Sequence, residues 1–132
     1  MEQRMVYTQP IVYFDLETTG IDKKKDKVIQ LAAVKIWPSG RRDVINIMIN
    51  PQQEVDPFIY ELTGLTKAEL DASLPFSEWA SYLYYYFAST HDPEEDVVYD
   101  RVDLGGYNSA EFDVPFLTNE LARHGYTWDH DN

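Results

Sequence analysis

Two acidic residues, Asp15 and Glu17, lie at the end of a short apolar segment that starts at Ile11. The segment is rich in β-branched and aromatic side chains, which predicts a buried strand. Because side chains alternate along a strand, both carboxylates share one face, about 7 Å apart along it. Two such carboxylates repel each other unless a cation or a proton intervenes, and Mg²⁺ and Mn²⁺ prefer carboxylate oxygens. The pattern indicates either a metal site or two side chains that point into solvent at a strand end.

A third acidic residue, Asp113, follows a glycine pair, Gly105 and Gly106. The glycines and the polar residues after them predict the end of a strand and the start of a helix. An acidic residue in the first turn of a helix favours the helix dipole, which is the simplest explanation for Asp113 alone. Taken together with Asp15 and Glu17, it favours a site in which three carboxylates hold divalent metal ions.

The hydrophobic pattern predicts a scaffold with strands first and helices later. Turn signals after the first two strands would make the first three strands an antiparallel meander. The expected strands span residues 11–16, 28–37, 44–49 and 102–107, and the expected helices span residues 57–64, 75–87 and 112–124. We also expect a capping box at Thr66–Glu69 and an acidic loop at residues 91–96. This order predicts an α/β fold with a mixed sheet flanked by helices.

The composition bounds the function further. A chain of 132 residues fits one domain, and the absence of cysteine excludes a disulfide scaffold, a Cys-ligated zinc site and a thiol nucleophile. No apolar run is long enough to span a bilayer and no signal peptide is evident, so we expect a soluble, cytoplasmic protein without membrane contact. The net charge of −12 argues against nucleic-acid binding unless metal ions stand between the carboxylates and the phosphates.

Several motifs together resemble the DEDD, or DnaQ-like, 3′–5′ exonuclease superfamily, which includes the proofreading epsilon subunit of DNA polymerase III. Asp15–Gly20 is similar to its first motif, and Asn108–Asp113, in the frame Asn-x-x-x-Phe-Asp, is similar to its second motif. Residues 28–35, Asn50-Pro51 and Leu62–Thr66 match further landmarks of the family in the correct order. The resemblance covers residues 11 to about 124, nearly the whole chain.

The resemblance implies a ribonuclease H-like fold and hydrolysis of phosphodiester bonds by two ions, Mg²⁺ or Mn²⁺. By this resemblance Asp15 would bridge both ions, Glu17 would bind the ion that activates water, and Asp113 would hold the other. The expected substrate is the single-stranded 3′ end of DNA, or of RNA, and a polymerase is an expected partner. The expected substrate-binding residues are Thr18, Thr19 and Gly20 through their backbone, Leu65 near the terminal base (or simply in the core), and Asn108 through hydrogen bonds that support the site.

The third motif of the family, a His or Tyr followed five positions later by Asp, supplies the general base and a fourth carboxylate. His124 and Asp129 have this spacing, but Gly125 and Trp128 between them make a poor helix. The segment also follows the second-motif helix directly, so no element could return it to the site. We therefore expect residues 1–132 to be one exonuclease-like domain that is truncated at its C-terminus and has little or no nuclease activity.

Two alternatives to an exonuclease remain at this point. In a haloacid-dehalogenase-like phosphatase Asp15 would be the nucleophile, but Glu17 stands where such enzymes usually carry Asp. A catalytically silent binding or assembly module on the same fold is the second alternative, and the aromatic run at residues 82–87 could form its interface. The lysine-rich residues 23–27 could guide a nucleic-acid backbone or form a solvated loop.

Overall fold

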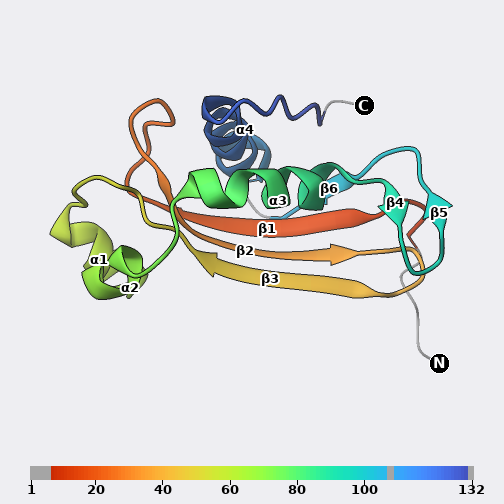
Figure 1. The fold of residues 1–132 in the computed structure, drawn as a ribbon, viewed down its shortest axis with the longest axis horizontal. Helices are drawn as coiled ribbons and strands as arrows, with labels where there is room; N and C mark the ends of the chain where they lie inside the picture. Colours follow the sequence, from red (N-terminus) through yellow and green to blue (C-terminus); the bar gives the residue numbers. More distant parts are fainter. Residues whose placement is uncertain (1–6, 107–108, 131–132) are drawn as a thin grey trace.

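The computed structural model describes residues 7–106 and 109–130, and its centre is a four-stranded mixed sheet (Figure 1). The strands β1 (Ile11–Thr18), β2 (Val28–Ile36) and β3 (Arg42–Met48) form the predicted antiparallel meander. The short strand β6 (Asp103–Gly105) returns beside β1 and pairs with it in parallel, which gives the order β3-β2-β1-β6. The predicted α/β fold with a mixed sheet is confirmed.

The two longer helices, α3 (Phe76–Ala88) and α4 (Val114–Arg123), lie on the same side of this sheet in Figure 1. The alternate β1 residues Val12, Phe14 and Leu16 are buried beneath them in the main hydrophobic core. The ring of Phe14 meets the ring of Phe87 edge-on, with 4.9 Å between their centroids. Because side chains alternate, Asp15 and Glu17 lie on the other face of β1.

Two short helices, α1 (Pro57–Thr63) and α2 (Lys67–Asp71), follow the sheet. Asp56 caps α1, and Gly64 ends it with a φ of 78°, a left-handed conformation that favours glycine. The capping box that the sequence predicts at Thr66 and Glu69 is present in full.

The chain departs from the predicted elements in two places. The acidic loop contains a small hairpin, β4 (His91–Asp92) with β5 (Val97–Val98), in which two adjacent valines favour an extended backbone. The last helix ends one residue early at Arg123 and is preceded by a π-helical turn, Ser109–Asp113. Pro115 has no N–H to donate to the carbonyl four residues earlier, which accounts for a wider turn before α4.

None of the described helices is long and apolar enough to cross a membrane.

Candidate active site

The carboxylates of Asp15 and Glu17 project from the last part of β1, on the face of the strand that the main core does not use. Asp15 is exposed, whereas Glu17 is half-buried. The pairing between β1 and β2 shifts register between Glu17 and Thr18. Such an irregularity redirects side chains at the end of a strand and is common beside active sites.

Asp113 reaches the same region from the other side, because it ends the π-helical turn that packs against β1. Its side chain is buried, with a residue exposure of 4%. Burial, followed by the negative charges of Asp15 and Glu17, raises the pKa of Asp113 to about 6. Burial, followed by the charge of Asp15, also raises the pKa of Glu17. The fold thus brings the three acidic residues within electrostatic reach of one another.

The three carboxylates do not form a closed ligand set. Within residues 7–106 and 109–130, no group of three acidic or histidine side chains is arranged closely enough to hold a metal ion. The donor set nevertheless suits a hard divalent cation, since it offers only carboxylate oxygens. A cation would also relieve the repulsion that adds to the effect of burial in raising the pKa values of Glu17 and Asp113.

The loop after β1 is organised by the carboxylate of Asp26. Thr19 donates its hydroxyl to Asp26 (2.9 Å), and the Thr19 N–H is already donated to the carbonyl of Lys27 (2.9 Å). A Cβ at Gly20 would lie 2.4 Å from Oδ2 of Asp26, so a glycine is needed here to make room for that carboxylate. Thr18 donates its hydroxyl to the carbonyl of Gly20 (2.6 Å). The three residues expected to meet the terminal nucleotide therefore form one tight turn.

Leu65 and Asn108 are the other two residues expected to bind the substrate. Leu65 is buried in a small hydrophobic cluster with Ile29 and Leu70, as a core residue would be. Asn108 lies outside the described residues. The ring of His124 stacks on Phe76, with 5.2 Å between centroids, and burial lowers the pKa of this histidine.

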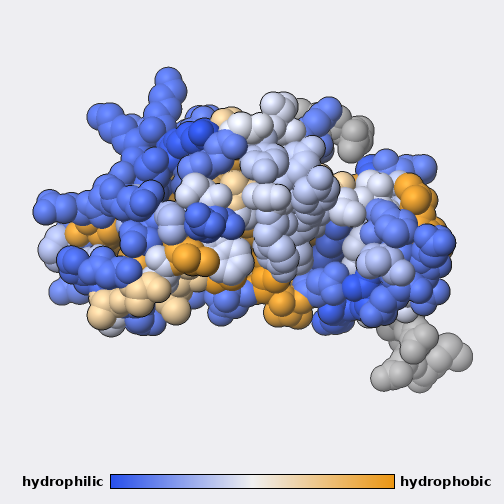
Figure 2. Space-filling view, viewed as in Figure 1, coloured by the Kyte–Doolittle hydropathy of each residue, from blue (hydrophilic) through white to orange (hydrophobic). Residues whose placement is uncertain are grey.

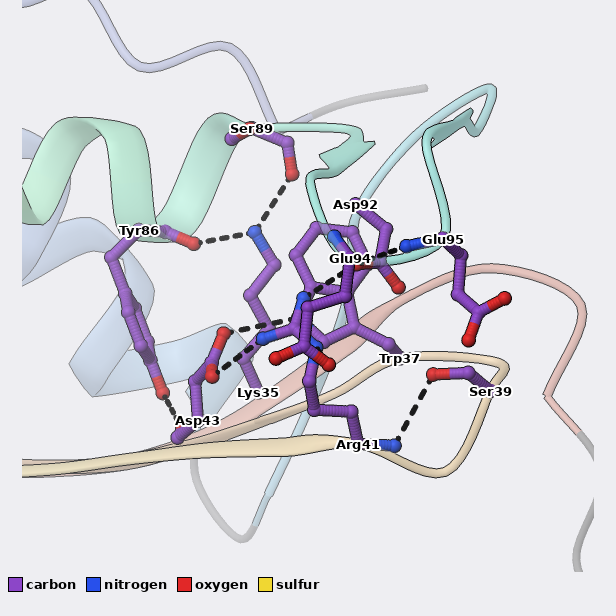
Figure 3. Close-up of polar contacts among 10 residues, drawn as sticks. All are labelled: Lys35, Trp37, Ser39, Arg41, Asp43, Tyr86, Ser89, Asp92, Glu94 and Glu95. Atoms are coloured by element: carbon purple, nitrogen blue, oxygen red, sulfur yellow. Dashed lines mark hydrogen bonds and ion pairs between the residues drawn. The ribbon is translucent and has the colours of Figure 1, made fainter.

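A buried ionic network that the sequence does not predict lies at the opposite end of the sheet (Figure 3). The ammonium of Lys35 donates to the carbonyls of Tyr86 (2.8 Å) and Ser89 (2.7 Å), at the C-terminal end of α3. Arg41 bridges Asp43 (2.8 Å) and the fully buried Asp92 (2.6 Å). The one sign of this network in the sequence is Lys35, a charged residue at a position of β2 where alternation predicts a buried side chain. The network joins the β2–β3 hairpin, α3 and the β4–β5 hairpin.

Comparison with known proteins decides the family. The sequence profile of the RNase T exonuclease family matches residues 12–131. The chain belongs to this exonuclease family. It is 41% identical over 128 residues to the DNA polymerase III PolC-type of Bacillus cereus, covering 92% of this chain and 8% of that protein. It is 31% identical over 122 residues to the 3′-5′ exonuclease DinG of Bacillus subtilis, covering 89% of this chain and 11% of that protein. Membership of this family removes the phosphatase alternative.

Solved structures of exonuclease I share the fold of this RNase T family member. A product-bound exonuclease I superimposes with a TM-score of 0.74 at 21% identity, covering 96% of this chain and 29% of that chain. Escherichia coli exonuclease I in complex with a dT13 oligonucleotide gives a TM-score of 0.72 at 22% identity, covering 94% and 27%. The chain thus spans a small part of the length of the relatives that it matches.

Proposed function

We propose that this exonuclease-family domain removes nucleotides from the 3′ end of a single DNA strand, using two divalent ions held by Asp15, Glu17 and Asp113. The observation that carries this proposal is the buried carboxylate of Asp113, whose pKa is raised to about 6 by burial and by the charges of Asp15 and Glu17. Acidic groups that repel one another, one of them buried, gain most when cations bind between them. The DinG relative, a 3′-5′ exonuclease, and the oligonucleotide complex of exonuclease I support the direction and the substrate.

In this proposal the three carboxylates have different roles in holding the ions, and other residues contact the nucleotide. Asp15, the most exposed of the three, would help to hold both ions, Glu17 would hold the ion that activates water, and Asp113 would hold the other. Bound Mg²⁺ or Mn²⁺ would supply positive charge for the attacking and leaving oxygens of an in-line displacement. The turn at Thr18–Gly20 contacts the terminal nucleotide, Leu65 lies near its base, and Asn108 supports the site by hydrogen bonding.

We expect slow hydrolysis from the 132-residue chain itself. Within its sequence we accept no counterpart of the third family motif, which would add a general base and a fourth carboxylate. General-base catalysis contributes roughly 10²- to 10⁴-fold to a rate. The chain should therefore fall short of a complete exonuclease by a factor in this range.

The test is a digestion of single-stranded oligonucleotides that carry a fluorophore at the 5′ end. With Mg²⁺ or Mn²⁺, and with the chain in excess over the oligonucleotide, the labelled strand should shorten slowly from its 3′ end, one nucleotide at a time, and EDTA should stop the reaction. Asp113→Asn should abolish digestion because a metal-holding carboxylate is lost. Glu111→Gln removes a charge from an exposed residue of the same turn and should leave the activity unchanged.

Release of the label as a mononucleotide at the earliest times would show digestion from the 5′ end and contradict the proposal. Equal activity of Asp113→Asn and the unaltered chain would contradict the assigned site. The same assay with an RNA oligonucleotide shows whether the chain digests DNA or RNA.

A second candidate function is a binding module that holds a strand without cleaving it. The observation that favours it is the open arrangement of the described acidic side chains, which form no closed metal cluster. The PolC-type relatives favour a polymerase as the partner in either case. Strand binding without any metal-dependent digestion would support this second function.

A further inference from the structure

The loop between β1 and β2 exposes three consecutive lysines, Lys23, Lys24 and Lys25. In residues 7–106 and 109–130, four exposed cations form no ion pair, namely these three lysines and Arg42 on β3. Most other cations of the described chain are paired with carboxylates or buried, as Arg41 and Lys35 are. Unneutralised positive charge is thus concentrated in one loop of a chain whose net charge is −12.

The backbone of this loop is fixed, although its lysine side chains are free. The carbonyl of Lys23 accepts hydrogen bonds from Asn119 and Arg123 of α4, and Arg123 also donates to the carbonyl of Asp26 (3.1 Å). Within the loop, Asp26 accepts from the N–H of Asp22 (2.9 Å). A loop anchored in this way presents its three ammonium groups from a defined position, so binding an anion would order little besides the side chains.

The loop continues directly from the strand that carries Asp15 and Glu17. In Figure 1 it projects from the end of β1 beside α4, and Figure 2 shows hydrophilic side chains standing out from this corner of the molecule. Lys23 lies six positions after Glu17, so the two backbones are at most about 22 Å apart. A strand whose 3′ end lies at the carboxylates would therefore bring phosphates a few nucleotides away within reach of the lysines.

We propose that Lys23, Lys24 and Lys25 form a phosphate-contacting surface that holds the single strand upstream of its 3′ end. The inference rests on the proposed function, because that function places the 3′ end at Asp15 and Glu17. Lysines that each neutralise a phosphate release counterions, which strengthens binding in a salt-dependent way. In an acidic domain such a surface offsets the repulsion between the strand and the remaining carboxylates.

The experiment compares two variants that each lose three positive charges. In the loop variant, Lys23, Lys24 and Lys25 are replaced by Gln. In the control variant, Arg42, Lys67 and Arg101 are replaced by Gln, which lowers the net charge equally at exposed positions outside the loop. Binding of 5′-fluorescein-labelled dT12 is followed by fluorescence anisotropy in EDTA between 25 and 200 mM salt, and thermal unfolding confirms that both variants fold.

The loop variant should bind dT12 about tenfold or more weakly at low salt, and its slope of log K against log salt should be smaller by about 2. The control variant should stay within about twofold of the unaltered chain. Equal weakening of both variants would overturn the inference, because net charge alone would then explain binding. An unchanged loop variant, or no binding of dT12 by the unaltered chain, would also overturn it.

Competition with a twelve-residue oligoglutamate peptide tests whether the loop distinguishes dT12 from another polyanion. If it displaces dT12 with equal affinity, the loop is a general anion surface and the inference fails. The metal-free assay requires no hydrolysis, so its outcome is independent of the proposed reaction. If the unaltered chain never digests DNA but the loop variant binds dT12 more weakly, the proposed function is contradicted and the lysine surface is still supported.

Discussion

At the scale of single residues, the proposed metal site depends most on Asp113. Its carboxylate is buried at the end of a π-helical turn, facing the charges of Asp15 and Glu17. Neither its burial nor its neighbours stabilise the ionised form, so the folded chain favours the protonated one. A group placed in this way is costly to the fold and points to a functional role.

The stability of the metal-free chain should respond to Asp113→Asn. The pKa of Asp113 is about 6 in the folded chain and 3.8 as its ordinary value. Between these pH values the folded state binds more protons than the unfolded state, so the free energy of unfolding falls as pH rises. The Asn variant lacks this ionisation, so its free energy of unfolding should not fall in this way. We expect it to be more stable than the unaltered chain at pH 7 by about 1–3 kcal/mol.

Urea unfolding in EDTA at several pH values from 4 to 7 measures this difference. Glu111→Gln serves as the control and should keep the pH dependence of the unaltered chain. A less stable Asp113→Asn variant, or one whose stability falls between pH 4 and 6 as steeply as that of the unaltered chain, would contradict the environment that the structure gives Asp113.

At the scale of elements, Lys35 joins β2 to the end of α3. Its ammonium donates to two carbonyls at the C-terminal end of α3 and lies over the ring of Trp37, 4.5 Å from the centroid. Burial nevertheless dominates and lowers the pKa of Lys35 from 10.5 to about 8. The charged lysine is therefore held by its partners at a cost in solvation.

The pH dependence of stability above pH 8 should change with Lys35→Met. Between pH 8 and 10.5 the unfolded chain binds the proton that the folded chain has lost, so Lys35 makes the free energy of unfolding rise with pH. This contribution is about 2–3 kcal/mol and should vanish in the Met variant. The difference between the two unfolding curves at pH 7, 8, 9 and 10 isolates it from the tyrosines, which titrate in both proteins. Parallel curves would contradict the assigned environment of Lys35.

The elements also show what could be predicted from the sequence. The meander and its inward apolar face follow from alternation, and the cap of α2 follows from Thr66 and Glu69. The sequence predicts a fourth strand in a mixed sheet, but it does not predict that β6 pairs with β1 in parallel. The π-helical turn before Pro115 and the partners of Lys35 depend on contacts between distant segments, which local periodicity does not encode.

At the scale of the whole molecule, a group of acidic residues and a group of unpaired lysines lie near the same end of β1. The acidic residues Asp15, Glu17 and Asp113 meet beside β1, and the free lysines project from the loop that follows it. The sequence identified Asp15, Glu17 and Asp113 as one group because their motifs matched a family in order and spacing. It did not predict that Asn119 and Arg123 of α4 would anchor the lysine loop, since those contacts span about a hundred residues.

The most direct test of the central claim is a calorimetric titration of the 132-residue chain with Mn²⁺. We predict saturable binding, weakened by about tenfold or more in Asp113→Asn because one carboxylate of the group is lost. Glu111→Gln should bind Mn²⁺ as the unaltered chain does. No binding by the unaltered chain, or the same affinity in Asp113→Asn, would contradict the claim that Asp15, Glu17 and Asp113 form one metal site.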